Sequence, residues 1–435
     1  MKKKIILLVI ITLIIVTLSY QYRKLNIISA YAAKELCSCV FDAGRNPDSV
    51  VKNDLNLPFI KFAKGEVDYS NRTVKASVWG LSPRTAVYRE GFGCSLSDGS
   101  NTIQAHQNVD SFFTSQNNSL SWPLGNKVYI KPTVNSIFQQ VSDSFFQHTY
   151  RTRSFLIIKN DSIVFERYAP GITDSTKLLG WSMTKSIFNA LVGIMVKQEK
   201  LSLSAPLNIK EWQNDERKKI TLLNLLQMNS GLKWNEDYTT VSDATNMLYN
   251  SNNMYFSAIE AKSQYKPGTH WQYSSGTSNI ISGIMRRSFD NDSLYYIFPY
   301  KELFSKINAP SFIVETDPSG NFAASSYSYA TTRDWGKLGL LYMHNGNWYG
   351  KQILPNNWIT TCTTPAKGLN KEYGAHLWLY NSEDTNDPLH GMFMFRGHNG
   401  QRVFIIPSKQ MVVVRLGLKS IDNSTMYEYL KMLCQ

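Results

Sequence analysis

Cysteine is scarce in this chain of 435 residues, and its five cysteines are not spaced as metal ligands. No two of them are separated by two residues, and the histidines do not cluster near them. Structural zinc sites usually show such spacings, so we expect no metal site. In an oxidising compartment a disulfide can join Cys94 to either Cys37 or Cys39, and the odd count leaves at least one free thiol.

Acidic residues are also few, 33 against 46 lysines and arginines, which gives a formal net charge of +13. The basic residues are scattered, and they do not interleave with aromatic residues as in nucleic-acid-binding proteins, so we expect no nucleic-acid partner. The excess charge either serves general solubility or favours attraction to an anionic cell envelope. Internal repeats and low-complexity blocks are absent, and a hydrophobic content of 43% is enough for a sizeable core.

Long apolar runs are absent except near the start of the chain. Lys2–Lys4 is followed by the almost wholly apolar run Ile5–Leu18, which is short for a full membrane span. No good cleavage site lies close behind this run, because Ala30–Ala32 is far downstream. For residues 1–24 we therefore expect an uncleaved signal-anchor rather than a cleaved signal peptide. Either form predicts a body exported to the periplasmic or extracellular side of the membrane.

Residues 25–120 read as an N-terminal stalk and a β-rich extension. A helical stalk is predicted at Asn26–Cys39, and a hairpin is predicted for the β-rich runs Val74–Trp79 and Arg84–Arg89. Residues 97–127 are rich in Ser, Asn, Gln and Gly and are predicted to be a loop, with a domain boundary near Leu120.

Residues 121–435 show an α+β pattern, with strands near both ends of this region and helices between them. Strands are predicted at Ser154–Lys159, Ser162–Tyr168, Arg402–Ile406 and Gln410–Leu416, and helices at Asn135–Thr149, Ile187–Val196, Ile220–Met228, Ser275–Phe289, Thr331–His344 and Ser424–Leu433. The early and late strands are expected to share one antiparallel sheet.

Ser182 and Lys185 form the first pattern that indicates chemistry. On a helix, residues three apart share one face with Cβ atoms about 5–6 Å apart, so an amine comes within reach of the hydroxyl. A serine needs a neighbouring base to act as a nucleophile, and lysine becomes a base when burial lowers its pKa. The structural alternative is an N-cap serine followed by a solvated lysine, which is the commoner case on spacing alone.

Three further stretches suit such a site. Tyr273 precedes a predicted helix, where its phenol can exchange protons with the serine, although it can equally be an aromatic core residue. In Arg396–Gln401 the glycines allow backbone to approach a substrate and His398 can donate a hydrogen bond, although the segment can also be a plain tight turn. The polar and aromatic loop Ser230–Tyr238 either lines a pocket or is an ordinary surface connection.

Taken together, these motifs resemble those of the penicillin-recognising serine enzymes, which include class C β-lactamases, D-alanyl-D-alanine carboxypeptidases and related esterases. The segments Ser182–Lys185, Tyr273–Ser275 and His398–Gly400 are similar, in order and separation, to the three motifs of that family. Ile220–Leu232 and Ala330–Leu341 are similar to its intervening segments. The resemblance covers about residues 135–420 and is strongest to the branch that contains 6-aminohexanoate-dimer hydrolase and its carboxylesterase relatives.

The resemblance implies a β-lactamase/transpeptidase-like α+β fold, an antiparallel sheet flanked by helices with an all-helical subdomain, for the hydrolase domain at 121–435. It implies that Ser182 attacks an ester or amide while Lys185 and Tyr273 carry its proton. The N–H groups of Ser182 and Gln401 would form an oxyanion hole, worth about 3–4 kcal/mol per donor. No metal or organic cofactor is implied. The oxyanion-hole and substrate-binding residues are then Gln401, His398, Asn399, Gly400, Tyr238, Trp181 and Ser275.

Two departures from the family pattern bear on the substrate. Ser275 stands where class C β-lactamases have asparagine, and His398 stands where true β-lactamases usually have lysine. Both changes argue against penicillinase activity and leave acyl transfer intact. We therefore predict an envelope-facing serine hydrolase for a small-molecule or peptide ester or amide. The alternatives are a D-Ala-D-Ala carboxypeptidase or β-lactamase, or a catalytically silent binding protein with the same fold.

Overall fold

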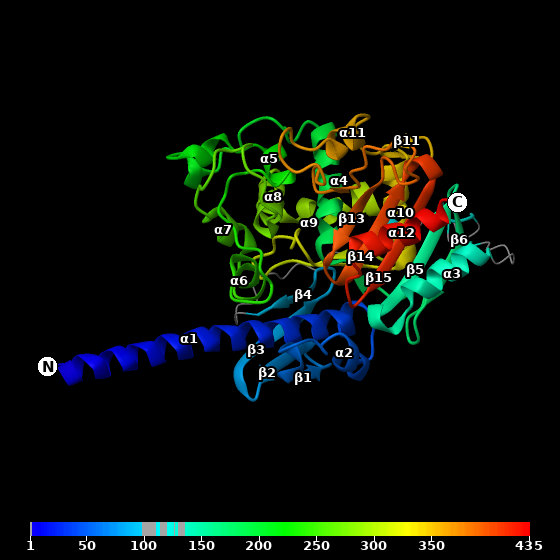
Figure 1. Cartoon of the computed structure of the whole chain (residues 1–435). Helices are drawn as coiled ribbons and strands as arrows, with labels where there is room; N and C mark the ends of the chain where they lie inside the picture. The colour runs from blue at the N-terminus through cyan, green and yellow to red at the C-terminus, as the bar shows by residue number, and fades with distance from the viewer. Residues whose placement is uncertain (1, 98–109, 114–119, 126, 129–134) are drawn as a thin grey trace.

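A six-stranded antiparallel sheet forms the centre of the computed structural model (Figure 1), which describes residues 2–97, 110–113, 120–125, 127–128 and 135–435. The strand order is β12-β13-β14-β15-β5-β6, so strands from both ends of the hydrolase region share one sheet, as predicted. Their bounds are β5 Thr152–Lys159, β6 Ser162–Tyr168, β12 Trp378–Leu379, β13 Phe393–Gly397, β14 Gln401–Ile406 and β15 Met411–Gly417. Much of the loop predicted at 97–127 lies outside the described residues.

Both faces of this sheet are buried, and every residue of the central strands β14 and β15 is buried. Along β14, Val403 and Ile405 belong to the larger core cluster, while Phe404 and Ile406 belong to the smaller one on the opposite face. Helices α3 (Ser136–Phe145) and α12 (Asn423–Leu433) cover the smaller cluster, and α10 (Thr332–Met343) covers the other face. The three helices occur where the sequence predicted them, with ends shifted by a few residues.

A helical lobe lies beside the sheet, with helix α4 (Thr184–Lys197) between the two (Figure 1). Residues Thr184 to Met195 of α4 are buried, which explains why the stretch Ile187–Val196 is apolar except for Asn189. The lobe consists of α5 Leu222–Leu226, α6 Asp243–Tyr249, α7 Met254–Ile259, α8 Ser275–Arg287 and α9 Asp292–Pro299. The α+β fold with an all-helical subdomain is thus confirmed.

Short elements connect the sheet and the lobe. Strands β7 (Leu178–Leu179), β9 (Ser328–Ala330) and β8 (Ile313–Val314) form a small antiparallel sheet next to the start of α4. Farther along the chain lie β10 Asn347–Trp348, β11 Lys351–Gln352 and helix α11 Trp358–Thr363.

The N-terminal part contains one long helix and a second antiparallel sheet. Helix α1 (Lys2–Cys37) continues as a π-helical turn to Asp42, and α2 (Pro47–Asn53) follows. The sheet has the order β1-β2-β3-β4, with bounds Ala63–Asp68, Thr73–Val78, Leu81–Arg89 and Gly93–Leu96. Strands β2 and β3 form the predicted hairpin, whereas β1 and β4 were not predicted as separate strands.

The second half of α1 packs against this sheet and against the hydrolase body, so it is not a free stalk (Figure 1). Cys37 forms the disulfide with Cys94 of β4, which decides between the two partners that the sequence left open, while Cys39 is buried as a free thiol. Within the described part of the chain, no helix has both the length and the apolar character that crossing a bilayer requires.

Candidate active site

Ser182 lies in a single 3₁₀ turn, Trp181–Met183, that leads directly into α4. Trp181 has a φ of 50°, in the left-handed region that bulky residues rarely occupy. The turn is held in part by the Thr184 hydroxyl, which donates to the Trp181 carbonyl at 2.7 Å. Ser182 therefore sits at the N-terminal end of a buried helix, where the helix dipole favours developing negative charge.

Lys185 lies one turn further along α4 and reaches back to the serine. Its Nζ donates to Ser182 Oγ at 3.2 Å, to Ser275 Oγ at 3.2 Å and to the Ser325 carbonyl at 2.9 Å. The side chain is only 2% exposed. Burial lowers the pKa of Lys185 to about 8, and the negative charge of Glu236 opposes part of this change. The amine is thus neutral often enough near neutral pH to accept a proton from Ser182.

Tyr273 immediately precedes Ser274, the N-cap of α8. The Lys185 Nζ is 5.0 Å from the centre of its ring. Burial and the charge of Glu236 raise the pKa of Tyr273, and its hydrogen bond with Ser182 lowers the pKa in part. The phenol is therefore protonated at neutral pH and can pass a proton to a leaving group at Ser182.

Glu236, which sequence reasoning did not select, organises the polar side of the site. One of its carboxylate oxygens accepts from the Ser275 hydroxyl at 2.5 Å, and the other accepts from the Ser275 backbone N–H at 2.8 Å. The Trp234 indole N–H and the Tyr238 hydroxyl also donate to it, at 2.5 and 2.7 Å. Ser275 thereby links Glu236 to Lys185. The only signal in the sequence was the position of Glu236 within the polar and aromatic loop.

His398 directly follows β13 and lies next to Trp181 and Tyr238. Its ring lies 5.6 Å from the Trp181 ring and 6.1 Å from the Tyr238 ring. The turn that presents it is fixed from behind by the buried Arg415, which donates to the Asn399 and Gly400 carbonyls at 2.9 Å each. A side chain at Gly400, where φ is 78°, would meet the Arg415 guanidinium at 2.3 Å.

Asn399 and Gln401 follow His398 in the turn that leads into β14. The Gln401 side chain bonds to the Gly417 backbone in both directions, at 2.6 Å from Nε2 and 2.9 Å to Oε1. Both residues border a small cavity behind Trp181. The Gln401 side chain is thus structural, and any role in an oxyanion hole falls to its backbone N–H.

His376 is a second residue that sequence reasoning missed. It is buried beneath α4, with Nδ1 3.0 Å from the Lys185 carbonyl and Nε2 3.1 Å from Ser278 Oγ of α8. Burial, together with the charge of Lys185, lowers the pKa of His376 to about 3. The ring is therefore neutral, with Nδ1–H donating to the carbonyl and Nε2 accepting from the serine. It joins the catalytic helix to the helical lobe.

A family model described as Beta-lactamase matches residues 134–420, which is more than half of the chain. The chain belongs to the beta-lactamase family. Three solved structures share the fold with it at low identity. A protein provisionally assigned as a 6-aminohexanoate-dimer hydrolase from Bacillus anthracis is 22% identical, with 67% of this chain and 80% of that chain covered and a TM-score of 0.59.

The other two solved structures are penicillin-binding proteins in name. The one from Bacillus halodurans is 15% identical, covers 69% of this chain and 98% of that chain, and has a TM-score of 0.52. The octameric homologue from Pyrococcus abyssi is 17% identical, covers 68% of this chain and 76% of that chain, and also has a TM-score of 0.52. At these identities the likeness establishes the fold alone.

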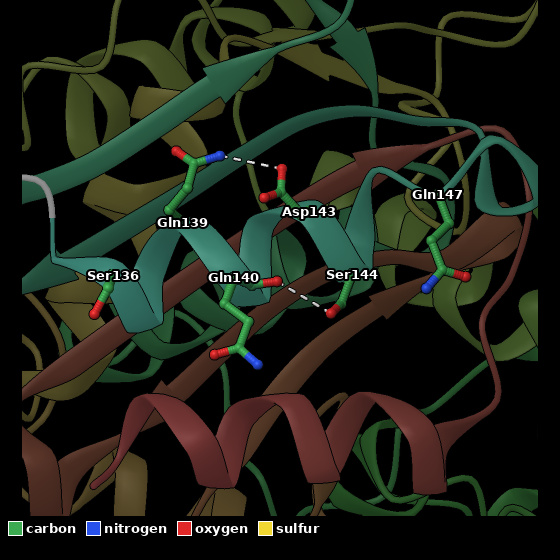
Figure 2. Close-up of a pocket in the computed structure, with 6 residues that line it drawn as sticks. All are labelled: Ser136, Gln139, Gln140, Asp143, Ser144 and Gln147. Atoms are coloured by element: carbon green, nitrogen blue, oxygen red, sulfur yellow. Dashed lines mark hydrogen bonds between the residues drawn. The ribbon is translucent and has the colours of Figure 1, made fainter.

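Two other features of this beta-lactamase-family chain offer no competing site. A polar hollow of about 620 Å³ runs along α3, lined by Ser136, Gln139, Gln140, Asp143, Ser144 and Gln147, and contains none of the site residues (Figure 2). Among the described residues, donor atoms of Glu35, Cys39 and Asp54 lie within 4.8 Å of one another. Asp54 is already paired with Arg45 and Arg153, so this cluster does not indicate a metal ion.

Proposed function

We propose that this protein is a serine hydrolase that cleaves an ester or an amide through an acyl-enzyme on Ser182. The observation that carries the proposal is the position of Lys185 Nζ, buried and 3.2 Å from the serine hydroxyl with a lowered pKa. Tyr273 lies next to this pair, with its ring centre 5.0 Å from the Lys185 Nζ, and its interaction with Ser182 lowers the pKa of Tyr273 in part. A nucleophile with a base and a proton donor in contact is what acyl transfer requires.

In the first step the Ser182 oxygen bonds to the carbonyl carbon of the substrate, and its proton passes to Lys185. The oxyanion that forms is stabilised by backbone N–H groups, for which those of Ser182 and Gln401 are the proposed donors. The carbon–oxygen or carbon–nitrogen bond then breaks, and the leaving group takes a proton through Tyr273. Water attacks the acyl-enzyme by the same route in reverse, which releases the acid and restores the serine.

The proposed substrate is a small ester or amide rather than a β-lactam. Ser275 and His398 replace the asparagine and lysine of β-lactamases, and Ser275 is committed to Lys185 and Glu236. The kcat/KM for short-chain p-nitrophenyl esters should exceed that for nitrocefin. Efficient turnover of nitrocefin or of D-Ala-D-Ala peptides would instead favour the β-lactamase or carboxypeptidase alternative.

The direct test is covalent labelling of the purified protein with a fluorophosphonate probe. Wild-type protein should be labelled and should hydrolyse p-nitrophenyl esters, whereas Ser182→Ala should do neither while keeping its circular dichroism spectrum. Ser186→Ala is a suitable control, since this buried serine bonds to the His376 carbonyl and not to Lys185. A wild-type protein that is neither labelled nor active would support the silent binding protein.

We also propose export to the cell envelope. The basic and apolar start of the chain supports this, as does the disulfide between Cys37 and Cys94, since such bonds persist mainly in oxidising compartments. Fractionation of cells with an antibody to the hydrolase domain tests it, and recovery of the protein in the cytoplasmic fraction would contradict it.

A further inference from the structure

The Trp181 side chain, directly before the nucleophile, is enclosed by three aromatic rings from distant parts of the chain. Its ring centre lies 6.1 Å from that of Tyr31, 6.3 Å from that of Tyr327 and 5.6 Å from that of His398. Tyr327 and His398 fall within the family match at 134–420, whereas Tyr31 belongs to α1, which lies outside it. The N-terminal helix of this chain thus contributes one wall of the support for the nucleophile turn.

Helix α1 is fixed in this position by buried polar contacts. Lys34 forms an ion pair with Glu315, and these residues are only 4% and 0% exposed. The Lys34 Nζ also lies 4.2 Å from the centre of the Tyr327 ring, one of the rings that enclose Trp181. Ser38 donates to the same carboxylate at 2.7 Å. A buried ion pair tolerates little displacement, since moving one partner leaves the other charge uncompensated.

The backbone conformation of Trp181 affects the geometry of the active site at Ser182. Its left-handed backbone, with φ at 50°, sets the orientation of the peptide bond to Ser182 and so the direction of the Ser182 N–H. That N–H is a proposed oxyanion donor, and its placement matters most in the transition state. A bulky residue stays in this region of conformational space only when its surroundings hold it there.

We infer that Tyr31 is a positioning residue of the active site, which makes α1 an integral part of the catalytic unit. The Tyr31 ring stacks on Trp181 at an interplanar angle of 25° and also contacts Tyr249, at 5.7 Å, at the end of α6. The cavity between α1 and the nucleophile turn is about 20 Å³, room for roughly one water molecule. Removing the ring would open enough space for the indole to move. This inference rests on the hydrolase function proposed above.

The test compares the esterase kinetics of three variants of the full chain. Tyr31→Ala should lower kcat at least tenfold with KM changed less than twofold, because the ring acts on the transition state and not on substrate binding. Tyr31→Phe keeps the ring, so its kcat should stay within twofold of wild type. Leu36→Ala is the matched control, since Leu36 is a buried residue of α1 that packs on Gly65 of β1. It should lower the melting temperature and leave kcat within twofold.

Each outcome decides the matter. If the wild type is active and both Tyr31→Ala and Leu36→Ala keep its kcat, the positioning role is overturned and the hydrolase function stands. A wild type that neither hydrolyses esters nor reacts with the fluorophosphonate overturns both. If circular dichroism shows that Tyr31→Ala is unfolded, Tyr31→Leu, which keeps apolar bulk without the ring, takes its place under the same kinetic criterion.

Discussion

The proposed chemistry of the site depends on proton exchange among three side chains, those of Ser182, Lys185 and Tyr273. Lys185 donates to the serine hydroxyl at 3.2 Å, and its Nζ lies 5.0 Å from the centre of the Tyr273 ring. Neither group has an ordinary pKa, because burial disfavours the charged form of each: the pKa of Lys185 falls and that of Tyr273 rises. In the proposed mechanism, lysine is therefore the base and tyrosine the acid.

Tyr273→Phe removes only the phenol oxygen and should lower kcat about 10²–10⁴-fold with the fold intact. Lys185→Ala should be nearly as severe as Ser182→Ala. Because residues that act as a unit fail together, Lys185→Ala/Tyr273→Phe should be little worse than Lys185→Ala alone. Steady-state ester kinetics measure all four variants. Tyr373→Phe is the control, since the Tyr373 ring packs 5.9 Å from that of Tyr273. Fully multiplicative losses would mean that lysine and tyrosine act independently.

Burial lowers the pKa of Lys185, and the negative charge of Glu236 opposes part of this lowering. Replacing Glu236 should therefore shift the pH dependence of kcat/KM. If neutral Lys185 is the base, kcat/KM of the wild type rises with pH through about 8. Glu236→Gln removes the charge that favours the ammonium form, so the pKa falls and the rising limb moves to lower pH, by up to about one unit. Glu383→Gln, an exposed carboxylate on the surface, should not move it. A limb that stays in place in Glu236→Gln would show that another group titrates.

Residues of the site could be predicted from the sequence only where they belong to a short local motif. Ser182 with Lys185, Tyr273 with Ser275, and His398 each belong to a short motif with fixed spacing, and the structure brings them together. Glu236 and His376 belong to no such motif, because their roles arise from contacts with Ser275 and with the Lys185 carbonyl that only the tertiary fold creates.

At the scale of elements, helix α4 carries Lys185 and directly follows the turn that holds Ser182, and the neighbouring elements fix where these two side chains point. His376 bonds to the carbonyl of Lys185 and to Ser278 of α8, so it connects the catalytic helix with the lobe that supplies Tyr273. Periodicity predicted the existence of α4, α8, α10 and α12 because each buries one apolar face or more. It did not predict β1, because five of its six residues are of types depleted in strands, nor β13, which is only five residues long.

Replacing His376 should make stability less sensitive to acid. The folded-state pKa of His376, about 3, lies below its ordinary value of 6.5, so the unfolded chain binds the proton first. The histidine term in the unfolding free energy is therefore lost as pH falls from about 6.5 toward 3, by up to about 1.4 kcal/mol per pH unit. In His376→Asn, which suits the positive φ of 56° at this position, that loss should disappear.

Urea unfolding at pH 4.5 and pH 7 measures this effect for wild type and His376→Asn. The variant should be less stable than wild type at pH 7, since hydrogen bonds to buried groups are lost, and the difference should narrow at pH 4.5. His390→Asn, in the surface turn after Asp387, controls for histidine titration in general. Parallel pH dependence of wild type and His376→Asn would contradict the assignment of a neutral buried ring.

At the scale of the whole molecule, the N-terminal part and the hydrolase domain share one core. Residues of α1 and of β2 belong to the same apolar cluster as α4 and α10. The sequence predicted the helix and the hairpin of this extension. It predicted the helix as a stalk, whereas in the structure α1 packs against the rest of the protein. Local periodicity cannot show docking, because the contacts of Lys34 with Glu315 span 281 positions of the chain.

The disulfide between Cys37 and Cys94 should stabilise this N-terminal part by restricting the unfolded chain. The two cysteines are 57 positions apart, and closing a loop of this length is worth roughly 4 kcal/mol in the chain-entropy description. Cys37→Ser/Cys94→Ser should therefore unfold at a clearly lower guanidinium concentration than wild type, and wild type with a thiol reductant should approach the variant. Cys434→Ser removes a free thiol and should leave the guanidinium midpoint unchanged.

If α1 unfolds separately from the hydrolase domain, tryptophan emission and circular dichroism will give different midpoints. The lower midpoint should then shift in Cys37→Ser/Cys94→Ser. Equal midpoints for wild type and Cys37→Ser/Cys94→Ser would show that the buried contacts of α1 hold it in place without the covalent link.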